Sequence, residues 1–119
     1  MTLEYKNINM ISQPKRQPTP GCNECGVEKT LRIIGSKWTM NILHNLFDGK
    51  KRFGELQKLL IGISTKTLSV RLQELEREKI ISKKVFAEVP LHVEYSLTDK
   101  GKSLGVLFKD MAKWGEAKA

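Results

Sequence analysis

Three leucines between residues 64 and 79 have the spacing of one face of an α-helix. Leu68, Leu72 and Leu75 recur at i, i+4 and i+7, so a helix with 3.6 residues per turn carries all of them on the same side. Ser64, just before them, is a good helix N-cap. The opposite side holds mainly polar and basic residues, which serve either solubility alone or the binding of a partner. The spacing predicts a helix that packs on a core through its leucines.

The flanking segments predict a helix-turn-helix followed by a β-hairpin. Residues 53–60 form a short amphipathic pattern whose apolar side holds Phe53, Leu56, Leu59 and Leu60. A basic edge strand or turn at 50–53 precedes it, and Gly62 stands in a tight turn before the leucine helix. In such an arrangement the second helix enters the DNA major groove. Beyond that helix the apolar period changes to two over residues 80–89 and 92–98, as expected for two antiparallel strands. A hairpin in this position is a wing.

Further helices are predicted on both sides of this unit. A short one covers residues 27–35, and a longer one follows the cap residue Ser36 and ends at Gly49. The last helix starts at Thr98 and carries a large apolar stripe. Part of this stripe is predicted to form a dimer contact, and packing on its own domain is a compatible alternative. The candidate dimer contacts in this helix are Leu104, Leu107, Phe108, Met111 and Trp114.

These elements together predict a mainly α fold with a small β-hairpin (α+β). The expected architecture is a winged helix-turn-helix with an opening helix and a C-terminal dimerisation helix. Residues 1–21 contain three prolines and no sustained periodicity, so a flexible N-terminal arm is expected there. Residues 22–119 are predicted to form the DNA-binding domain, including the dimerisation helices, because a chain of 119 residues has room for one such domain.

The charge of the chain indicates a polyanionic partner. The formal net charge is +8, and residues 50–84 contain ten basic but only four acidic residues. Nucleic acid or an anionic membrane surface would fit this balance. No apolar run approaches the roughly 18 residues that span a bilayer, and the first residues lack the apolar region of a secretory signal. We therefore expect a cytoplasmic protein that does not bind membranes.

No enzyme or metal site is predicted. The chain shows no paired carboxylates, nucleophile–base combination or glycine-rich phosphate loop. Cys22 and Cys25 form a single C-x-x-C without a second pair, which completes neither a zinc site nor a disulfide framework. We expect free thiols and no cofactor.

Short motifs along the chain resemble the HxlR-type family of bacterial winged helix-turn-helix transcriptional regulators. They occur in the family's order from residue 25 to residue 115, and only the arm lies outside them. The motifs are CGVE at 25–28, IGSKW at 34–38, DGKKRFGEL at 48–56, GIS at 62–64, RL at 71–72, VP at 89–90, VEYSLT at 93–98 and WG at 114–115.

This resemblance implies a dimer built from the opening and C-terminal helices, which adds Leu31 to the candidate dimer contacts. The dimer would bind a two-fold symmetric operator, with one recognition helix and one wing for each half-site. Some family members use the cysteine corresponding to Cys25 as a thiol sensor, and a helix N-terminus with Lys29 nearby would favour its thiolate. The sequence departs from the family pattern at Cys22, which adds a second thiol, at Ile61, where a proline is common, and at His92, where the wing more often has arginine.

The predicted site residues divide by role. Base edges are assigned to the outer side of the leucine helix, where a glutamine suits adenine and a valine the thymine methyl. Two arginines of the same helix are expected to contact the DNA backbone, and five basic residues elsewhere to contact flanking phosphates. The residues expected at base edges are Thr65, Lys66, Ser69, Val70 and Gln73. The two backbone-contacting arginines are Arg71 and Arg77, and the residues expected at flanking phosphates are Lys51, Arg52, Lys83, Lys84 and His92.

The sequence therefore predicts a sequence-specific regulator that binds double-stranded DNA as a homodimer, with Cys25 and Cys22 as candidate thiol sensors. A nonspecific nucleic-acid-binding protein, nucleoid-like or directed to RNA, would use the same basic surface. A protein-interaction module that uses only the C-terminal stripe is the other alternative.

Overall fold

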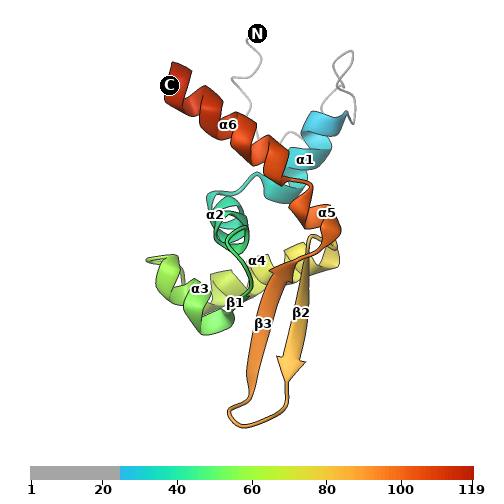
Figure 1. Ribbon diagram of the computed structural model, residues 1–119, viewed down its shortest axis with the longest axis vertical. Helices are drawn as coiled ribbons and strands as arrows, with labels where there is room; N and C mark the ends of the chain where they lie inside the picture. The colour runs from blue at the N-terminus through green and yellow to red at the C-terminus, as the bar shows by residue number, and fades with distance from the viewer. Residues whose placement is uncertain (1–24) are drawn as a thin grey trace. The chain divides into compact units, whose positions relative to one another are not determined.

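The computed structural model describes residues 25–119 (Figure 1). The predicted arm at 1–21 and Cys22 lie outside the described residues. The elements in chain order are α1 (Gly26–Ile34), α2 (Lys37–Leu46), β1 (Lys51–Arg52), α3 (Phe53–Leu59), α4 (Thr65–Arg77), β2 (Ile81–Phe86), β3 (His92–Leu97), α5 (Asp99–Lys102) and α6 (Gly105–Lys118).

The chain divides into two compact units between residues 32 and 33, within α1. The described part of the first unit is residues 25–32, in which Val27 and Leu31 are exposed. The second unit, residues 33–119, contains the end of α1 and every other element. The predicted helix-turn-helix and wing therefore belong to a single unit.

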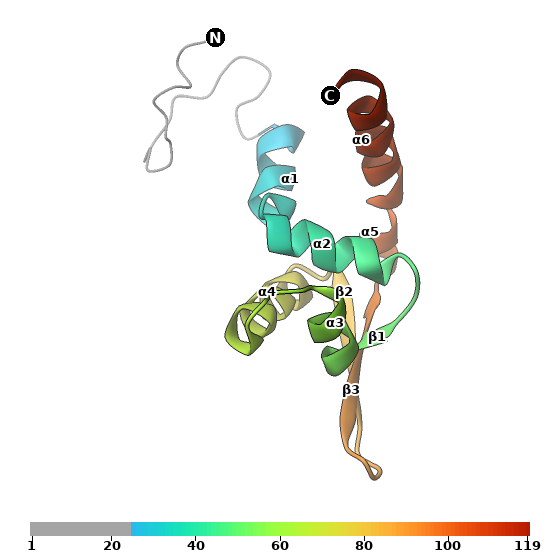
Figure 2. The ribbon, with the colours of Figure 1, turned by 90° about the vertical axis from the view of Figure 1, so that its left-hand side faces the viewer.

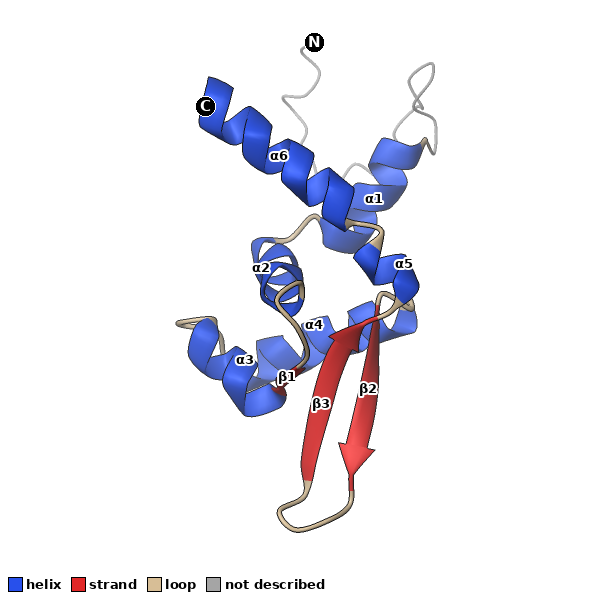
Figure 3. Cartoon of the chain, in the orientation of Figure 1, coloured by secondary structure: helices blue, strands red, loops and turns tan. Residues whose placement is uncertain are grey.

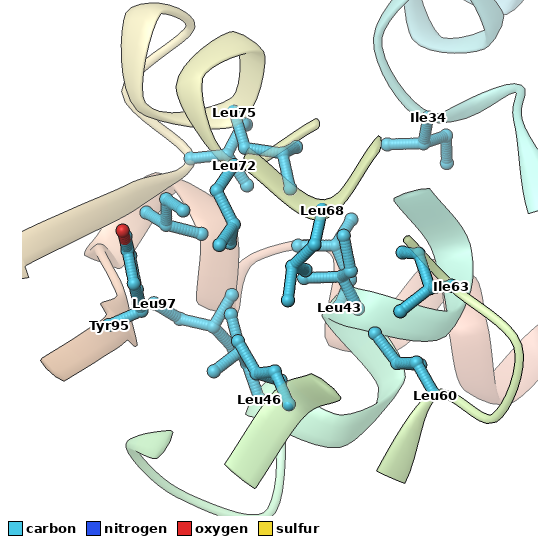
Figure 4. Packing of buried hydrophobic residues seen from close by; sticks show 14 residues of the cluster. Ile34, Leu43, Leu46, Leu60, Ile63, Leu68, Leu72, Leu75, Tyr95 and Leu97 are labelled. Carbon is cyan, nitrogen blue, oxygen red and sulfur yellow. The ribbon is translucent and has the colours of Figure 1, made fainter. Parts of the chain in front are cut away.

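The leucine face of α4 forms the centre of the core in this second unit. Leu68 has no exposed surface, and Leu72 and Leu75 are each 1% exposed. They belong to one buried cluster with residues of α2, α3 and the sheet (Figure 4). Burying a leucine side chain stabilises a fold by roughly 1.5–3 kcal/mol, so the three together fix which side of α4 faces inward. The side predicted to be buried is confirmed.

The strands form a three-stranded antiparallel sheet in the order β1-β3-β2, seen in red in Figure 3. Ile81 pairs with Leu97 at one end of the hairpin, and Phe86 pairs with His92 at the other. The short basic segment before α3 forms the edge strand β1. The predicted hairpin is present, and of the two alternatives for residues 50–53, an edge strand or a turn, the structure forms the edge strand.

Tyr95 of β3 extends the core into the sheet. Its side chain is buried, at 8% exposure. Burial raises the pKa of the Tyr95 hydroxyl above its usual value, and the negative charge of Glu76 on α4 raises it further. The phenol therefore stays neutral in this buried position, where a charged group would be poorly solvated.

The junction between α4 and α5 is held by several hydrogen bonds. The chain leaves α4 through Lys79, whose φ of 64° lies in the left-handed region. The Thr98 hydroxyl donates to the Lys79 carbonyl at 2.6 Å and lies 3.0 Å from the Ile80 carbonyl oxygen, a second acceptor. Lys100 Nζ donates to the Glu78 carbonyl at 2.9 Å. The start of α5 is thereby fixed to the C-terminal end of the predicted recognition helix.

The single C-terminal helix predicted from Thr98 onward is instead broken into α5 and α6. The Ser103 hydroxyl donates to the Lys100 carbonyl at 2.5 Å. The Leu104 amide donates to the Gly101 carbonyl, three residues back, at 3.0 Å. A serine side chain that bonds the backbone and a tighter turn of this kind both interrupt the α-helical pattern. The apolar spacing gave no signal of this break.

The apolar stripe of the C-terminal helix divides between two environments. Leu104 and Phe108 are half-buried and pack against the core of their own chain. The Phe108 ring meets Phe47 edge-on, with centroids 5.2 Å apart. Exposed apolar side chains remain further along α6, namely Val106, Leu107, Met111 and Trp114. Two of the predicted dimer contacts thus have a place in the core, whereas the others do not.

Leu59 departs from the pattern predicted for α3. It was expected on the apolar side of the helix, but its exposure is 50%. Leu56 and Leu60 fill the core in this region, because α3 ends at Leu59 and the chain turns toward α4.

No helix within residues 25–119 is long and apolar enough to span a membrane.

Candidate nucleic-acid interface

The N-terminus of α4 begins after a turn that glycine makes possible. Gly62 has a φ of 94°, which side chains with a Cβ rarely adopt. Ser64 then caps the helix, and its hydroxyl oxygen accepts a hydrogen bond from the Thr67 amide at 3.0 Å. The first turn of α4 contains no acidic residue. A helix N-terminus with its positive dipole end and no carboxylate favours a phosphate or the edge of a base.

The side of α4 opposite the leucines is open to solvent. We define the α4 outer face by the residues predicted to contact base edges, namely Lys66, Val70 and Gln73 opposite the leucines, and Thr65 and Ser69 at the border of that side. All of them are exposed except Ser69, which is half-buried. Figure 2 shows α4 in the same layer as α3, with the hairpin extending beyond both. The outer face therefore offers a lysine, an amide, two hydroxyls and an apolar group for contact with a groove.

Arg71, predicted to contact the DNA backbone, is engaged within its own helix. Its Nη1 donates to Glu74 Oε1 at 3.1 Å. Its Nε is buried and has no hydrogen-bond partner among the described residues. The two side chains are 34% and 45% exposed. Surface pairs of this type contribute about 0–1 kcal/mol, so a phosphate could replace Glu74 at modest cost. Arg77, in the last turn of α4, is exposed.

The two wing lysines lie on opposite faces of the hairpin. Lys83 pairs with Tyr95 and Lys84 with Glu94, and successive side chains of a strand alternate between faces. Lys84 also reaches over the Phe86 ring, with its Nζ 5.1 Å from the centroid. Both lysines are exposed, yet they cannot contact one row of phosphates together.

His92 is held inside the wing. Its ring stacks on Phe86 at 4.6 Å with an interplanar angle of 11°. Its Nδ1 donates to the Pro90 carbonyl at 3.1 Å, and its Nε2 lies 3.5 Å from Glu94 Oε2. Both ring nitrogens thus face oxygen atoms of the wing itself. The structure gives His92 a role in shaping the wing, apart from the phosphate contact predicted for it.

The basic residues of β1 differ in exposure. Lys51 is half-buried, and its Nζ lies 3.4 Å from the Gly49 carbonyl. The side chain of Arg52 is exposed. The Arg52 backbone amide donates to Glu55 Oε1 at 2.7 Å, which fixes the start of α3. Because β1 pairs with β3, these two residues stand beside Tyr95 and Glu94, near the middle of β3.

Two relevant residues were missed by the sequence reasoning. Glu94 faces Lys50, with 3.6 Å between Nζ and Oε1, and places a negative charge among the wing's cations. The alternation of β3 could have revealed it, since it assigns Glu94 and His92 to one face. Gln57 of α3 donates to the Thr65 hydroxyl at 2.8 Å. No sequence pattern indicated this bond, because it depends on how α3 meets α4.

Cys25 stands at the start of α1. Its carbonyl accepts a hydrogen bond from the Lys29 amide at 3.1 Å. It is disulfide-bonded, and its partner lies outside the described residues. The expectation of free thiols is therefore wrong for Cys25. No group of three or more His, Cys, Asp or Glu side chains suited to a metal ion occurs within residues 25–119.

Comparison with known proteins identifies relatives of the chain. A family model described as HxlR-like helix-turn-helix matches residues 33–119. The HTH-type transcriptional regulator YdeP of Bacillus subtilis (strain 168) is 48% identical over 92 residues, which cover 77% of this chain and 72% of YdeP. The reduced form of the transcriptional regulator YodB from B. subtilis matches with a TM-score of 0.73 and 38% identity, covering 80% of this chain and 94% of YodB.

A further match is the redox regulator HypR in its oxidized form. It has a TM-score of 0.73 and 40% identity and covers 80% of this chain and 98% of HypR. YodB also matches in diamide-treated and quinone-bound forms. These likenesses agree with the mainly helical winged helix fold that the sequence predicted. The structure adds a third strand, β1, to the predicted hairpin.

Proposed function

The chain belongs to the HxlR-like helix-turn-helix family, whose members are transcriptional regulators, and from this premise we propose that it binds specific DNA sequences. Its target is a two-fold symmetric operator, occupied by a homodimer. Each protomer inserts α4 into the major groove of one half-site and lays its wing along the flanking backbone.

The observation that carries this proposal is the exposure of the α4 outer face. Leu68, Leu72 and Leu75 hold the opposite side of the helix rigidly in the core. Side chains on a fixed helix keep their relative positions, and this allows a surface to distinguish one base sequence from another. A surface that only neutralises phosphates needs no such fixed arrangement.

The homodimer is supported by α6. Its exposed apolar side chains include Met111 and Trp114, the latter at 63% exposure. Contiguous exposed apolar groups on a small protein commonly mark an interface, and most homo-oligomers are two-fold symmetric. Two protomers related by such an axis match an operator with two half-sites.

The first test compares specific with nonspecific binding. A duplex selected by the protein from a randomised pool is expected to bind about 10³-fold more tightly than a random duplex of equal length at physiological salt. Affinities within a few-fold of each other would instead indicate the nonspecific nucleic-acid binder. If neither duplex binds, the result would contradict DNA binding and favour the protein-interaction module.

Substitutions in the same assay separate the two kinds of contact. Gln73→Ala is expected to lower the preference for the selected duplex, because base contacts carry specificity. Lys84→Ala should weaken binding to both duplexes equally and reduce the salt slope by about 1, because it removes a phosphate contact. Lys113→Ala, which removes an exposed cation from α6, serves as the matched control for net charge.

We also propose that oxidation at Cys25 changes the affinity for the operator. Cys25 is disulfide-bonded and stands at the start of a helix. Relatives include a regulator solved in reduced, diamide-treated and quinone-bound forms. Diamide would join the sulfurs of two cysteines and take up the two protons and two electrons that their thiols lose. Cys22 is the other cysteine of the chain.

Treatment of the reduced protein with diamide is expected to change operator affinity about 5-fold or more, the range typical of coupling between sites. The measurement is a binding titration of reduced and treated protein against the selected duplex. Cys25→Ser should abolish the response, and Cys22→Ser reports whether the second thiol takes part. An equal response in wild type and Cys25→Ser would contradict the proposal.

A further inference from the structure

The hydroxyl groups at the start of α4 have different hydrogen-bond partners. The Ser64 hydroxyl uses both of its capacities within the helix cap. It accepts from the Thr67 amide at 3.0 Å and donates to the Thr67 hydroxyl at 3.0 Å. Its single proton is thus already directed at a neighbour, and Ser64 cannot donate to DNA without giving up this bond.

Thr65 has the opposite arrangement. Its hydroxyl oxygen accepts from Gln57 Nε2 at 2.8 Å. A threonine hydroxyl has one proton and two lone pairs, so the bond from Gln57 leaves the proton available to an outside acceptor. Thr65 is exposed, whereas Gln57 is half-buried on α3. The bond itself is exposed to solvent, so an outside acceptor can reach the hydroxyl proton that Gln57 does not use.

We propose that Gln57 is a positioning residue for DNA recognition and fixes the Thr65 hydroxyl as a hydrogen-bond donor toward the DNA. This inference rests on the proposed function. The group that Thr65 meets must be an acceptor, either a phosphate oxygen or, in the major groove, a purine N7, guanine O6 or thymine O4. The amino groups of cytosine and adenine donate and would be disfavoured at this position.

The bond crosses from the first helix of the helix-turn-helix to the second. Both helices are anchored independently of it, α3 through Leu56 and α4 through Leu68, which have no exposed surface. Removing the amide should therefore leave the fold intact and free only the orientation of the Thr65 hydroxyl. This separates a positioning role from a structural one.

The test is a double-mutant cycle with Gln57→Met and Thr65→Val. Methionine keeps the length and helix preference of glutamine without its donor, and valine keeps the shape of threonine without its hydroxyl. Each single variant is expected to bind the duplex selected by the wild type about 3- to 10-fold more weakly, the effect of one hydrogen bond. The double variant should bind no more weakly than Thr65→Val alone, because Gln57 acts only through that hydroxyl.

Lys58→Ala provides the matched control. Lys58 neighbours Gln57 on α3 and is exposed. The fold-change in duplex affinity caused by Lys58→Ala should therefore be independent of the fold-change caused by Thr65→Val, so that the two factors multiply in the double variant. If the effects of Gln57→Met and Thr65→Val also multiply, or if Gln57→Met binds like the wild type, the inference is overturned. Thermal unfolding of each variant shows that the fold is retained.

Single base-pair changes in the selected duplex identify the acceptor. If the loss caused by Thr65→Val disappears for one changed base pair, the acceptor is on that base. If the loss persists across all base-pair changes, the acceptor is a phosphate oxygen, and either result supports a donor at Thr65. Failure of the wild type to enrich any sequence would overturn the proposed function itself, whereas an enriched sequence with independent variant effects overturns only the inference.

Discussion

Gly101→Ala is expected to lower the free energy of unfolding by about 2–3 kcal/mol, near the upper end for overpacking a core. A Cβ at this position would collide with the backbone carbonyl oxygen of Ile80 and lie 3.0 Å from Leu97 Cδ2. The Leu97 side chain could move slightly to relieve its contact. The Ile80 carbonyl cannot move as easily, because it accepts hydrogen bonds from the Thr98 amide and hydroxyl, each at 3.0 Å.

The measurement is urea unfolding of wild type and variant. Gly105→Ala is the control, because its added Cβ would lie 3.6 Å from Phe47 Cε1, an ordinary contact. This variant should be unchanged or more stable by up to about 1 kcal/mol, since alanine favours the helix more than glycine does. Equal stability of Gly101→Ala and wild type would show that Gly101 and the Ile80 carbonyl can move apart to accommodate the added Cβ, and would contradict the prediction.

The second large effect is expected at α6. Replacing Met111 and Trp114 together by alanine should convert the proposed dimer to a monomer and weaken operator binding by about 10²-fold or more. A dimer binds its second half-site as an intramolecular step, an advantage of 10²–10⁴ that a monomer loses. The fold should persist, because Leu104 and Phe108 attach this helix to the core.

Two measurements check this prediction. Sedimentation reports the mass in solution, and titrations against duplexes with one or two half-sites report the affinity. The loss should be confined to the two-half-site duplex. Glu116→Gln, an exposed substitution on the opposite side of α6, should leave both measurements unchanged. A double variant that still sediments as a dimer would mean that α6 does not form the interface.

The elements predictable from the sequence were those with local signals. The position of α4 followed from a capping serine and the leucine spacing, and both are confirmed with Ser64 as the cap. The hairpin followed from a change to period two. Because successive side chains of a strand alternate between faces, Lys83 and Lys84 lie on opposite faces of the hairpin. The prediction gave both lysines the same role from their charge alone and did not take this alternation into account.

Features that depend on contacts between elements were not predictable. The break before α6 has no apolar signal and coincides with the close approach of Gly101 to Ile80, twenty-one residues earlier in the chain. The wing role of His92 requires the pairing with Phe86 across the hairpin. The bond between Gln57 and Thr65 requires the packing of α3 beside α4. In each case the residue type was visible in the sequence, but its partner was not.

The break at residues 103–104 has a consequence for operator length. In a dimer joined through α6, the direction of this helix relative to the anchored α5 sets how far apart the two α4 helices lie. A helix of 14 residues is about 21 Å long, so a bend of about 10° at the break would displace its far end by about 4 Å. One base-pair step is about 3.4 Å. In the proposed dimer, the direction of α6 after the break would therefore set the distance between the two α4 helices. Regulators with the same α4 but a different bend would then select operators with different spacers.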